Sequence, residues 1–286
     1  MARNNLVLKI VLDFIALVIV AFPLLALQLW ASPYERGYFA DDPSLRLPYK
    51  TQTVSEGLLA GLGFALLVVT IIIVEISRDV RGKSGGARSL GNCEIPAWVW
   101  ESYVAIGVFT FGAACQQLTV NIAKYVIGRL RPHFFDLCKP VPIDASTADS
   151  YITNFRCTGA AVTASTMKDM RLSFPSAHSG FAMYCAVFFI FYIQVKAKWR
   201  GSKLLRHVAQ FGVLIAAWYV GLSRVVDHMH HWSDVAVGFA VGAAFAVLTF
   251  IYVYAPVKRI RRESWITEPS TQPEMLPRPV LMAHSN

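Results

Sequence analysis

The sequence predicts an all-α fold, a bundle of six transmembrane helices. Of its 286 residues, 55% are hydrophobic and only 16% are charged, which is more apolar than a typical water-soluble domain. Crossing a hydrocarbon core of roughly 30 Å takes about 17 to 25 helical residues. Six apolar stretches approach or reach this length, and the spans are expected near Leu6 to Trp30, Ser55 to Ser77, Ala97 to Val120, Ser179 to Val195, Val208 to Leu222 and Val235 to Ala255.

The first apolar stretch is interpreted as a retained span and not as a signal peptide. It is too long for the apolar region of a signal peptide, it contains Asp13, and it ends in LQLWASPYE. The Trp and Tyr of that ending are typical of a membrane–water interface.

Two loops are long enough to carry structure or function. The loop after the first span contains PYERGYFADDPSLRLPYK and is expected to form an ordered cap on the membrane surface. The loop from about Asn121 to His178 is longer, and loops of that length are usually functional or disordered. Its middle, PIDASTADSYITNFRCTGAAVTAST, is rich in Ala, Ser and Thr and is interpreted as a spacer.

The chain is expected to divide into a six-span membrane domain, residues 1–256, and a cytosolic tail, residues 257–286. The tail is polar, contains several prolines and shows no helical or strand periodicity. This composition predicts disorder.

The distribution of Lys and Arg predicts the orientation, because cations are poorly translocated across the membrane. The N-terminus, the loops after spans two and four, and the tail together hold 16 of the 27 Lys and Arg residues. Both termini are therefore expected in the cytosol. A nucleic-acid partner is not expected, since the basic residues form no surface interleaved with aromatic side chains.

The predicted topology places the five cysteines in three different environments. Cys115 and Cys185 lie inside spans, and Cys93 lies in a cytosolic loop where thiols stay reduced. Cys138 and Cys157 lie in the long outer loop, so the sequence predicts a disulfide between them.

Three polar stretches at span ends share the outer face: KYVIGRLRPHF, SFPSAHSGF and SRVVDHMHHWSD. Ionisable residues at a membrane boundary are costly to bury, and they indicate a functional site. For any one of these residues alone, a snorkelling cation or an interfacial anchor is the competing explanation.

The order and spacing of the three stretches resemble the signature of the type 2 phosphatidic acid phosphatase superfamily, and more closely its lipid phosphate phosphatase branch. The similarity extends over all six spans and includes the RGYF and PYK pieces of the first outer loop. The family usually has Gly where this chain has Ala177. The matching residues are Lys124, Arg131, Pro132, Pro175, Ser176, His178, Ser223, Arg224, His230 and Asp234.

The residue types themselves suit a phosphate group. Lys124, Arg131 and Arg224 are three cations, and a phosphate monoester carries close to two negative charges at pH 7. Ser176 stands where a helix N-cap belongs, so the backbone N–H groups of Ala177 and the next residues are further phosphate donors.

A metal site is the competing interpretation of the third stretch. His228, His230, His231 and Asp234 could in isolation ligate zinc. Three nearby cations would repel a divalent ion, and no cysteine or second carboxylate completes the ligand set. We therefore expect no metal and no other cofactor.

Phosphoryl transfer needs a nucleophile and a proton for the leaving oxygen. His230 fits the nucleophile, because Asp234 four residues later can reach its second ring nitrogen, and His178 fits the general acid. His228 and His231 are rival nucleophiles. Asp227 is expected to pair with an arginine, and His133 to face solvent.

The resemblance implies a plasma-membrane phosphohydrolase whose active site, at the outer ends of spans three to six, faces the cell exterior or a lumen. Its substrates would be lipid phosphate monoesters: phosphatidate, lysophosphatidate, sphingosine 1-phosphate and ceramide 1-phosphate. The alternatives are a lipid phosphotransferase and a catalytically silent lipid-binding scaffold. Gly238 and Gly242 form a small-xxx-small pair that fits either packing within the bundle or a homo-oligomer.

Overall fold

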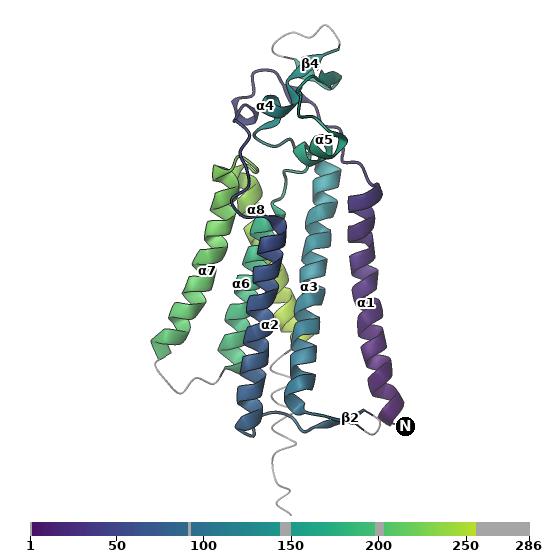
Figure 1. Ribbon diagram of the computed structural model, residues 1–286, viewed down its shortest axis with the longest axis vertical. Coiled ribbons are helices and arrows are strands. Elements are labelled where there is room, and N and C mark those ends of the chain that lie inside the picture. The colour runs from purple at the N-terminus through teal and green to yellow at the C-terminus, as the bar shows by residue number, and fades with distance from the viewer. Residues whose placement is uncertain (1, 91–92, 144–149, 198–202, 256–286) are drawn as a thin grey trace, which may run out of the picture.

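The computed structural model describes residues 2–90, 93–143, 150–197 and 203–255. The tail expected at residues 257–286 lies outside these ranges. Six long helices run side by side along the molecule and confirm the predicted all-α bundle (Figure 1). They are α1 (Ala2–Trp30), α2 (Glu56–Val80), α3 (Ala97–Ile127), α6 (Ala177–Lys196), α7 (Lys203–Val226) and α8 (Trp232–Leu248), the last continued by the π-helical turn η2 (Thr249–Tyr254).

Helix α3 extends further than the apolar pattern predicts. The expected span stopped at Val120, but the helix continues to Ile127 and therefore includes Lys124. Nothing between these positions breaks a helix until Gly128, which adopts a left-handed conformation with φ of 59°. A Cβ atom there would lie 2.1 Å from the carbonyl oxygen of Tyr34, so only glycine fits this chain reversal. The reversal directs the next residues back toward the bundle.

Helix α6 is the centre of the bundle, and it packs against α2, α3, α7 and α8. Aromatic side chains fill the core around it, among them Phe109, Tyr184 and Phe188. Helix α8 approaches α6 closely because Gly242 has no side chain: a Cβ atom there would lie 2.1 Å from the carbonyl oxygen of Gly180. Gly238 and Gly242 thus serve packing within the chain.

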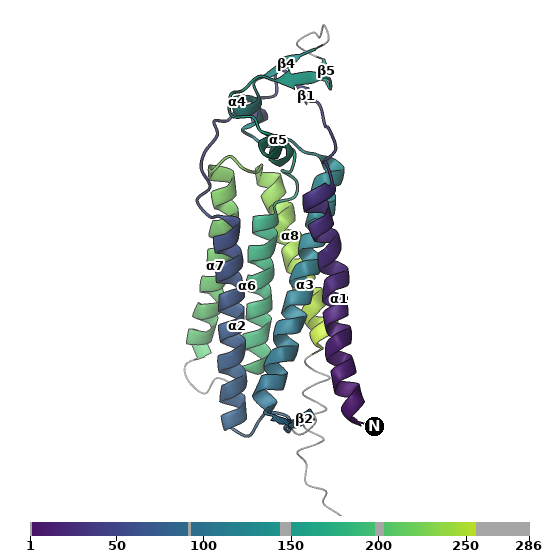
Figure 2. The same cartoon turned by 45° about the vertical axis from the view of Figure 1, so that its right-hand side comes forward.

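The loops at one end of the bundle fold together into a cap (Figure 2). Strand β1 (Tyr38–Phe39) pairs antiparallel with β5 (Tyr151–Ile152), and β4 (Pro140–Pro142) pairs with β6 (Phe155–Cys157). The cap also contains α4 (Phe134–Cys138), α5 (Ala164–Met170) and the 3-10 turn η1 (Pro43–Leu45). We call this end of the molecule the cap end.

The predicted disulfide is confirmed, with Cys138 and Cys157 joined and their Cα atoms 4.6 Å apart. Residues 142–166 were interpreted as a spacer, and this was wrong for residues 150–166, which the structure describes. Ile152 and Phe155 pack against Tyr38 and Phe134, so a few apolar residues anchor this segment despite its Ala, Ser and Thr content.

The opposite end of the bundle carries the strand pair β2 (Arg88–Leu90) and β3 (Cys93–Ile95) and a buried ionic cluster. The ammonium group of Lys196 lies 3.5 Å from carboxylate oxygens of both Glu75 and Glu101. The hydroxyl of Tyr192 donates to Glu75 at 2.8 Å. This cluster links α2, α3 and α6.

Candidate functional site

The three polar stretches meet between the bundle and its cap. Lys124 lies in the last turn of α3 and Arg224 in the last turn of α7. His178 lies in the first turn of α6, and Asp234 in the first turn of α8. Arg131 and His230 follow α3 and α7 in the loops of the cap end. Lys124 and Arg224, about 100 residues apart in the sequence, thus lie at the same end of the bundle. The fold brings together the three polar stretches that the sequence singled out.

Arg131 is buried and held from two sides. Its Nη2 atom lies 2.6 Å from the carboxylate of Asp169, and its Nη1 atom lies 3.2 Å from the sulfur of Met229. Its Nε atom is buried without a hydrogen-bond partner among the described residues. A buried donor without a partner is costly and fits a site that a ligand completes.

Arg224 and Lys124 are also buried and also have donor atoms without a partner among the described residues. Arg224 is only 1% exposed and donates from Nη1 to the side-chain oxygen of Gln52 at 3.2 Å, while its Nε atom has no partner in the described chain. Lys124 is 7% exposed, and its ammonium group takes part in none of the hydrogen bonds or ion pairs found in the described ranges. Three buried cations with unused donors form a strong anion site.

Ser176 caps α6 as expected, and its hydroxyl accepts a hydrogen bond from the N–H group of Ser179 at 3.4 Å. Its own N–H group donates to the carbonyl oxygen of Asp234 at 3.0 Å, which joins the start of α6 to the start of α8. The N-terminus of α6, with its free backbone N–H groups, therefore belongs to the anion site.

Replacing Ala177 by glycine is expected to change kcat/KM by no more than several-fold. Ala177 is the first residue of α6, and it is not among the non-glycine residues of the described chain that have positive φ. A helical backbone accepts Ala without strain. The comparison of kcat/KM for the wild type and Ala177→Gly checks this, and a hundredfold gain would show that Ala177 distorts the anion site.

His178 is 5% exposed, and its Nε2 atom is buried with no partner among the described residues. All three cations act on it electrostatically. An imidazole nitrogen without a partner, placed beside an anion site, can give a proton to a bound group when the ring is protonated and take one when the ring is neutral.

His230 is held as a neutral imidazole with a defined tautomer. Its Nδ1 atom lies 2.7 Å from the carbonyl oxygen of Ser173. A carbonyl can only accept, so Nδ1 carries the proton and Nε2 keeps a free electron pair. Burial, and secondarily the nearby cations, lower the pKa of His230 well below its usual value, although Asp234 opposes this shift. His230 is therefore neutral at physiological pH and has the free electron pair that a nucleophile needs.

Asp234 lies 3.8 Å from Nδ1 of His230, an ion-pair distance that is too long for a hydrogen bond. Ser173 makes the link between them: its carbonyl oxygen accepts from His230, and its hydroxyl donates to Asp234 at 2.6 Å. Asp234 also accepts from Nη1 of Arg129 at 2.5 Å. Sequence reasoning missed Ser173 and Arg129, although both lie inside the polar stretches.

The neighbouring histidines have other contacts. Nδ1 of His231 lies 3.3 Å from Asp234, and Nδ1 of His228 lies 2.7 Å from the carbonyl oxygen of Pro48. His133 was expected to face solvent, but it is 1% exposed and its Nδ1 atom lies 2.9 Å from the carbonyl oxygen of His228.

Asp227 was expected to pair with an arginine. Its carboxylate instead accepts from the backbone N–H group and the hydroxyl of Thr53, at 2.8 and 2.7 Å. It therefore holds the segment that leads into α2 against the end of α7.

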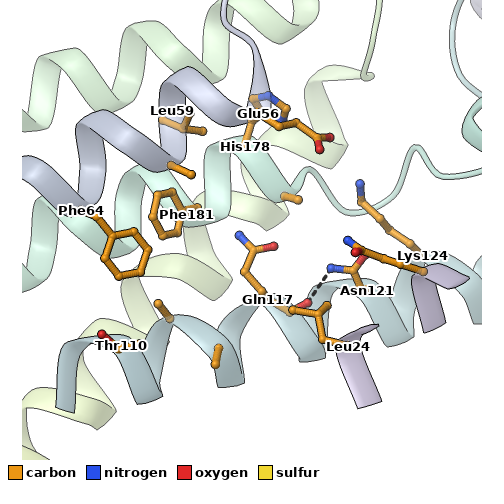
Figure 3. Close-up of a pocket in the computed structure, with 15 residues that line it drawn as sticks. Leu24, Glu56, Leu59, Phe64, Thr110, Gln117, Asn121, Lys124, His178 and Phe181 are labelled. Atoms are coloured by element: carbon orange, nitrogen blue, oxygen red, sulfur yellow. Dashed lines mark hydrogen bonds between the residues drawn. The ribbon is translucent and has the colours of Figure 1, made fainter. Parts of the chain in front are cut away.

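A cavity of about 330 Å³ extends from Lys124 and His178 into the bundle, between α1, α2, α3 and α6 (Figure 3). Apolar side chains such as Leu59, Phe64 and Phe181 line much of it. Its volume lies within the range of small-molecule sites, about 300 to 1,000 Å³. An anion site that continues into an apolar cavity suits an amphiphile with a phosphate head.

The sequence is similar to those of known phosphatases. Residues 105–258 match the PAP2 superfamily. A Drosophila melanogaster protein named "Putative phosphatidate phosphatase" is 42% identical over 88% of this chain and 70% of its own length. Phospholipid phosphatase 1 of Rattus norvegicus is 38% identical over 85% of this chain and 84% of its own length. Phospholipid phosphatase 2 of Mus musculus is 37% identical over 85% of each chain.

Proposed function

Because the chain belongs to the PAP2 superfamily, a family of membrane phosphatases, we propose that it hydrolyses lipid phosphate monoesters through a phosphohistidine intermediate. The observation that carries the proposal is the meeting of three buried cations with a neutral His230. The substrate class is that of phosphatidate, lysophosphatidate, sphingosine 1-phosphate and ceramide 1-phosphate.

In the first step, Lys124, Arg131 and Arg224 bind the phosphate oxygens, and the N-terminus of α6 adds backbone donors. Nε2 of His230 attacks phosphorus, and the bond between phosphorus and the lipid oxygen breaks. His178, which is protonated while the phosphate dianion is bound beside it, gives its proton to that oxygen, so the lipid leaves as a neutral alcohol. His230 is then phosphorylated on Nε2 and carries a positive ring, which Asp234 and the carbonyl oxygen of Ser173 stabilise.

In the second step, a water molecule takes the place of the alcohol. His178, now without its proton, accepts one from that water as the oxygen attacks phosphorus. The bond between phosphorus and Nε2 breaks, and inorganic phosphate leaves. Nothing in these two steps requires a metal ion, because the three cations and the helix N-terminus supply the positive charge.

The proposal is tested with purified protein in detergent, dioctanoyl phosphatidate as substrate, and release of inorganic phosphate as the signal. Turnover is expected to continue in excess EDTA. Turnover that stops with EDTA and returns with a divalent ion would contradict the metal-free mechanism. Protein that binds the lipid but never releases phosphate would support the scaffold alternative.

We further propose that the cap end faces the cell exterior or a lumen and that both termini are cytosolic, with the plasma membrane as the site of action. The excess of Lys and Arg in the segments at the opposite end supports this orientation. The disulfide in the cap supports it too, because disulfides persist in oxidising compartments.

Glycosylation mapping is expected to report this orientation. Ala145→Asn creates the acceptor Asn-Ser-Thr in the cap loop, and Arg200→Asn creates Asn-Gly-Ser in the loop between α6 and α7. A glycosidase-sensitive increase in mass is expected for the first variant only. An increase for the second variant alone would reverse the orientation.

A further inference from the structure

The cavity beside the anion site has a polar end and an apolar depth. Lys124 and His178 lie at its upper end, and apolar side chains such as Phe64 and Phe181 line its depth (Figure 3). Polar side chains from α1, α2 and α3 also line the cavity, namely Gln28, Glu56, Gln117 and Asn121. A lipid phosphate whose head lies at Lys124 would place the atoms that join its head to its chain near these polar side chains.

Glu56 is the acidic residue among those that line the cavity. It is the first residue of α2, and Figure 3 shows its carboxylate on the side of the cavity that faces Lys124. A carboxylate in the first turn of a helix is favourable in any protein, so its position alone implies no ligand. Its charge acts on Lys124 and Arg224, but no cation of the described chain lies within 4 Å of it. Close to a phosphate dianion, an unpaired carboxylate weakens binding unless the substrate offers it a hydrogen-bond donor.

Asn121 and Gln117 line the cavity from α3. The side-chain amide of Asn121 donates to the backbone carbonyl of Gln117 at 2.8 Å, which fixes its orientation. The Asn121 side-chain oxygen is left to accept from a ligand. Glu56 on α2 and Asn121 on α3 thus both offer oxygen acceptors in the part of the cavity near Lys124.

We propose that Glu56 is a specificity-determining residue that accepts a hydrogen bond from a hydroxyl or ammonium group beside the phosphate ester of a single-chain lipid phosphate. Lysophosphatidate and sphingosine 1-phosphate carry such donors. A diacyl lipid has ester oxygens at this position, which only accept and which the carboxylate disfavours. This inference rests on the proposed function, and it concerns which lipid phosphates the site prefers.

The test compares lysophosphatidate with its 2-deoxy analogue, which has the same chain but lacks the hydroxyl group. For the wild type, loss of the hydroxyl is expected to lower kcat/KM about tenfold, because a hydrogen bond to a charged acceptor is lost. For Glu56→Leu the two substrates should differ by less than twofold, and Glu56→Gln should fall between. Glu35→Gln removes a carboxylate from the exposed cap outside the cavity and should behave as the wild type.

Turnover of the 2-deoxy analogue by Glu56→Leu at the wild-type rate would show that the variant is folded. An equal tenfold difference between the two substrates in wild type and Glu56→Leu would overturn the role of Glu56 and leave the proposed function standing. Wild-type protein that hydrolyses neither substrate would overturn the proposed function, and the inference with it.

Discussion

Replacing His230 with alanine is expected to lower kcat by at least about 10⁴-fold, because loss of a covalent nucleophile removes the reaction path itself. The reason lies in the geometry of the residue. Its Nδ1 proton is held by the carbonyl oxygen of Ser173, and no hydrogen bond described for the chain uses its Nε2 atom. The measurement is release of inorganic phosphate from dioctanoyl phosphatidate by purified protein.

His228→Asn provides a matched control for the loss of a histidine in the same loop. His228 has a positive φ of 58°, and Asn tolerates this conformation better than Ala does. The control should keep turnover within several-fold of the wild type. If His228→Asn were as inactive as His230→Ala, the effect would come from the loop structure and not from a nucleophile.

Replacing His178 with alanine is expected to slow hydrolysis of phosphatidate by about 10² to 10⁴-fold, the usual contribution of a general acid. A substrate with a good leaving group needs little protonation, so para-nitrophenyl phosphate should be dephosphorylated by His178→Ala with a much smaller loss in the first step. The same substrate should not rescue His230→Ala. The measurement is the rate of the pre-steady-state release of para-nitrophenol.

His207→Ala is the control for this experiment, since His207 lies near the start of α7, at the end of the bundle opposite the site. It should match the wild type with both substrates. An equal loss for phosphatidate and para-nitrophenyl phosphate in His178→Ala would show that His178 does not protonate the leaving group.

The sequence predicted the bundle well because membrane spans depend on local composition. Each span is a continuous apolar run, and the hydrocarbon thickness sets its length. The limit of this reasoning appears at α3, where Lys124 lies inside the helix and not in the loop after it. Apolar content marks the membrane core, whereas the helix ends where Gly128 reverses the chain.

The contacts around His230 could not be predicted in the same way, because they join segments far apart in the sequence. The spacing of four residues suggested that Asp234 reaches His230, and it gave no sign that Ser173, 57 residues earlier, holds both of them. The pairing of Asp227 with Thr53 spans 174 residues. These contacts depend on how α6, α7 and α8 pack, which a motif does not encode.

Glu56 belongs to the same class of residues. In the sequence it is an ordinary acidic residue at the start of a span, which the helix dipole explains. Only the packing of α1, α2, α3 and α6 around a common cavity places it near Lys124 and His178. The sequence therefore could not identify Glu56 as a residue of the cavity, and the structure was needed to do so.

The central claim, a phosphohistidine at His230, is tested most directly by trapping the intermediate. Wild-type protein is mixed with lipid phosphate labelled in the phosphoryl group, quenched within milliseconds in excess EDTA, and digested for peptide mapping. We expect an acid-labile, base-stable label on the peptide that contains His230, and no such label in His230→Ala. A label that persists in His230→Ala, or steady turnover by the wild type with no covalent label at any quench time, would contradict it.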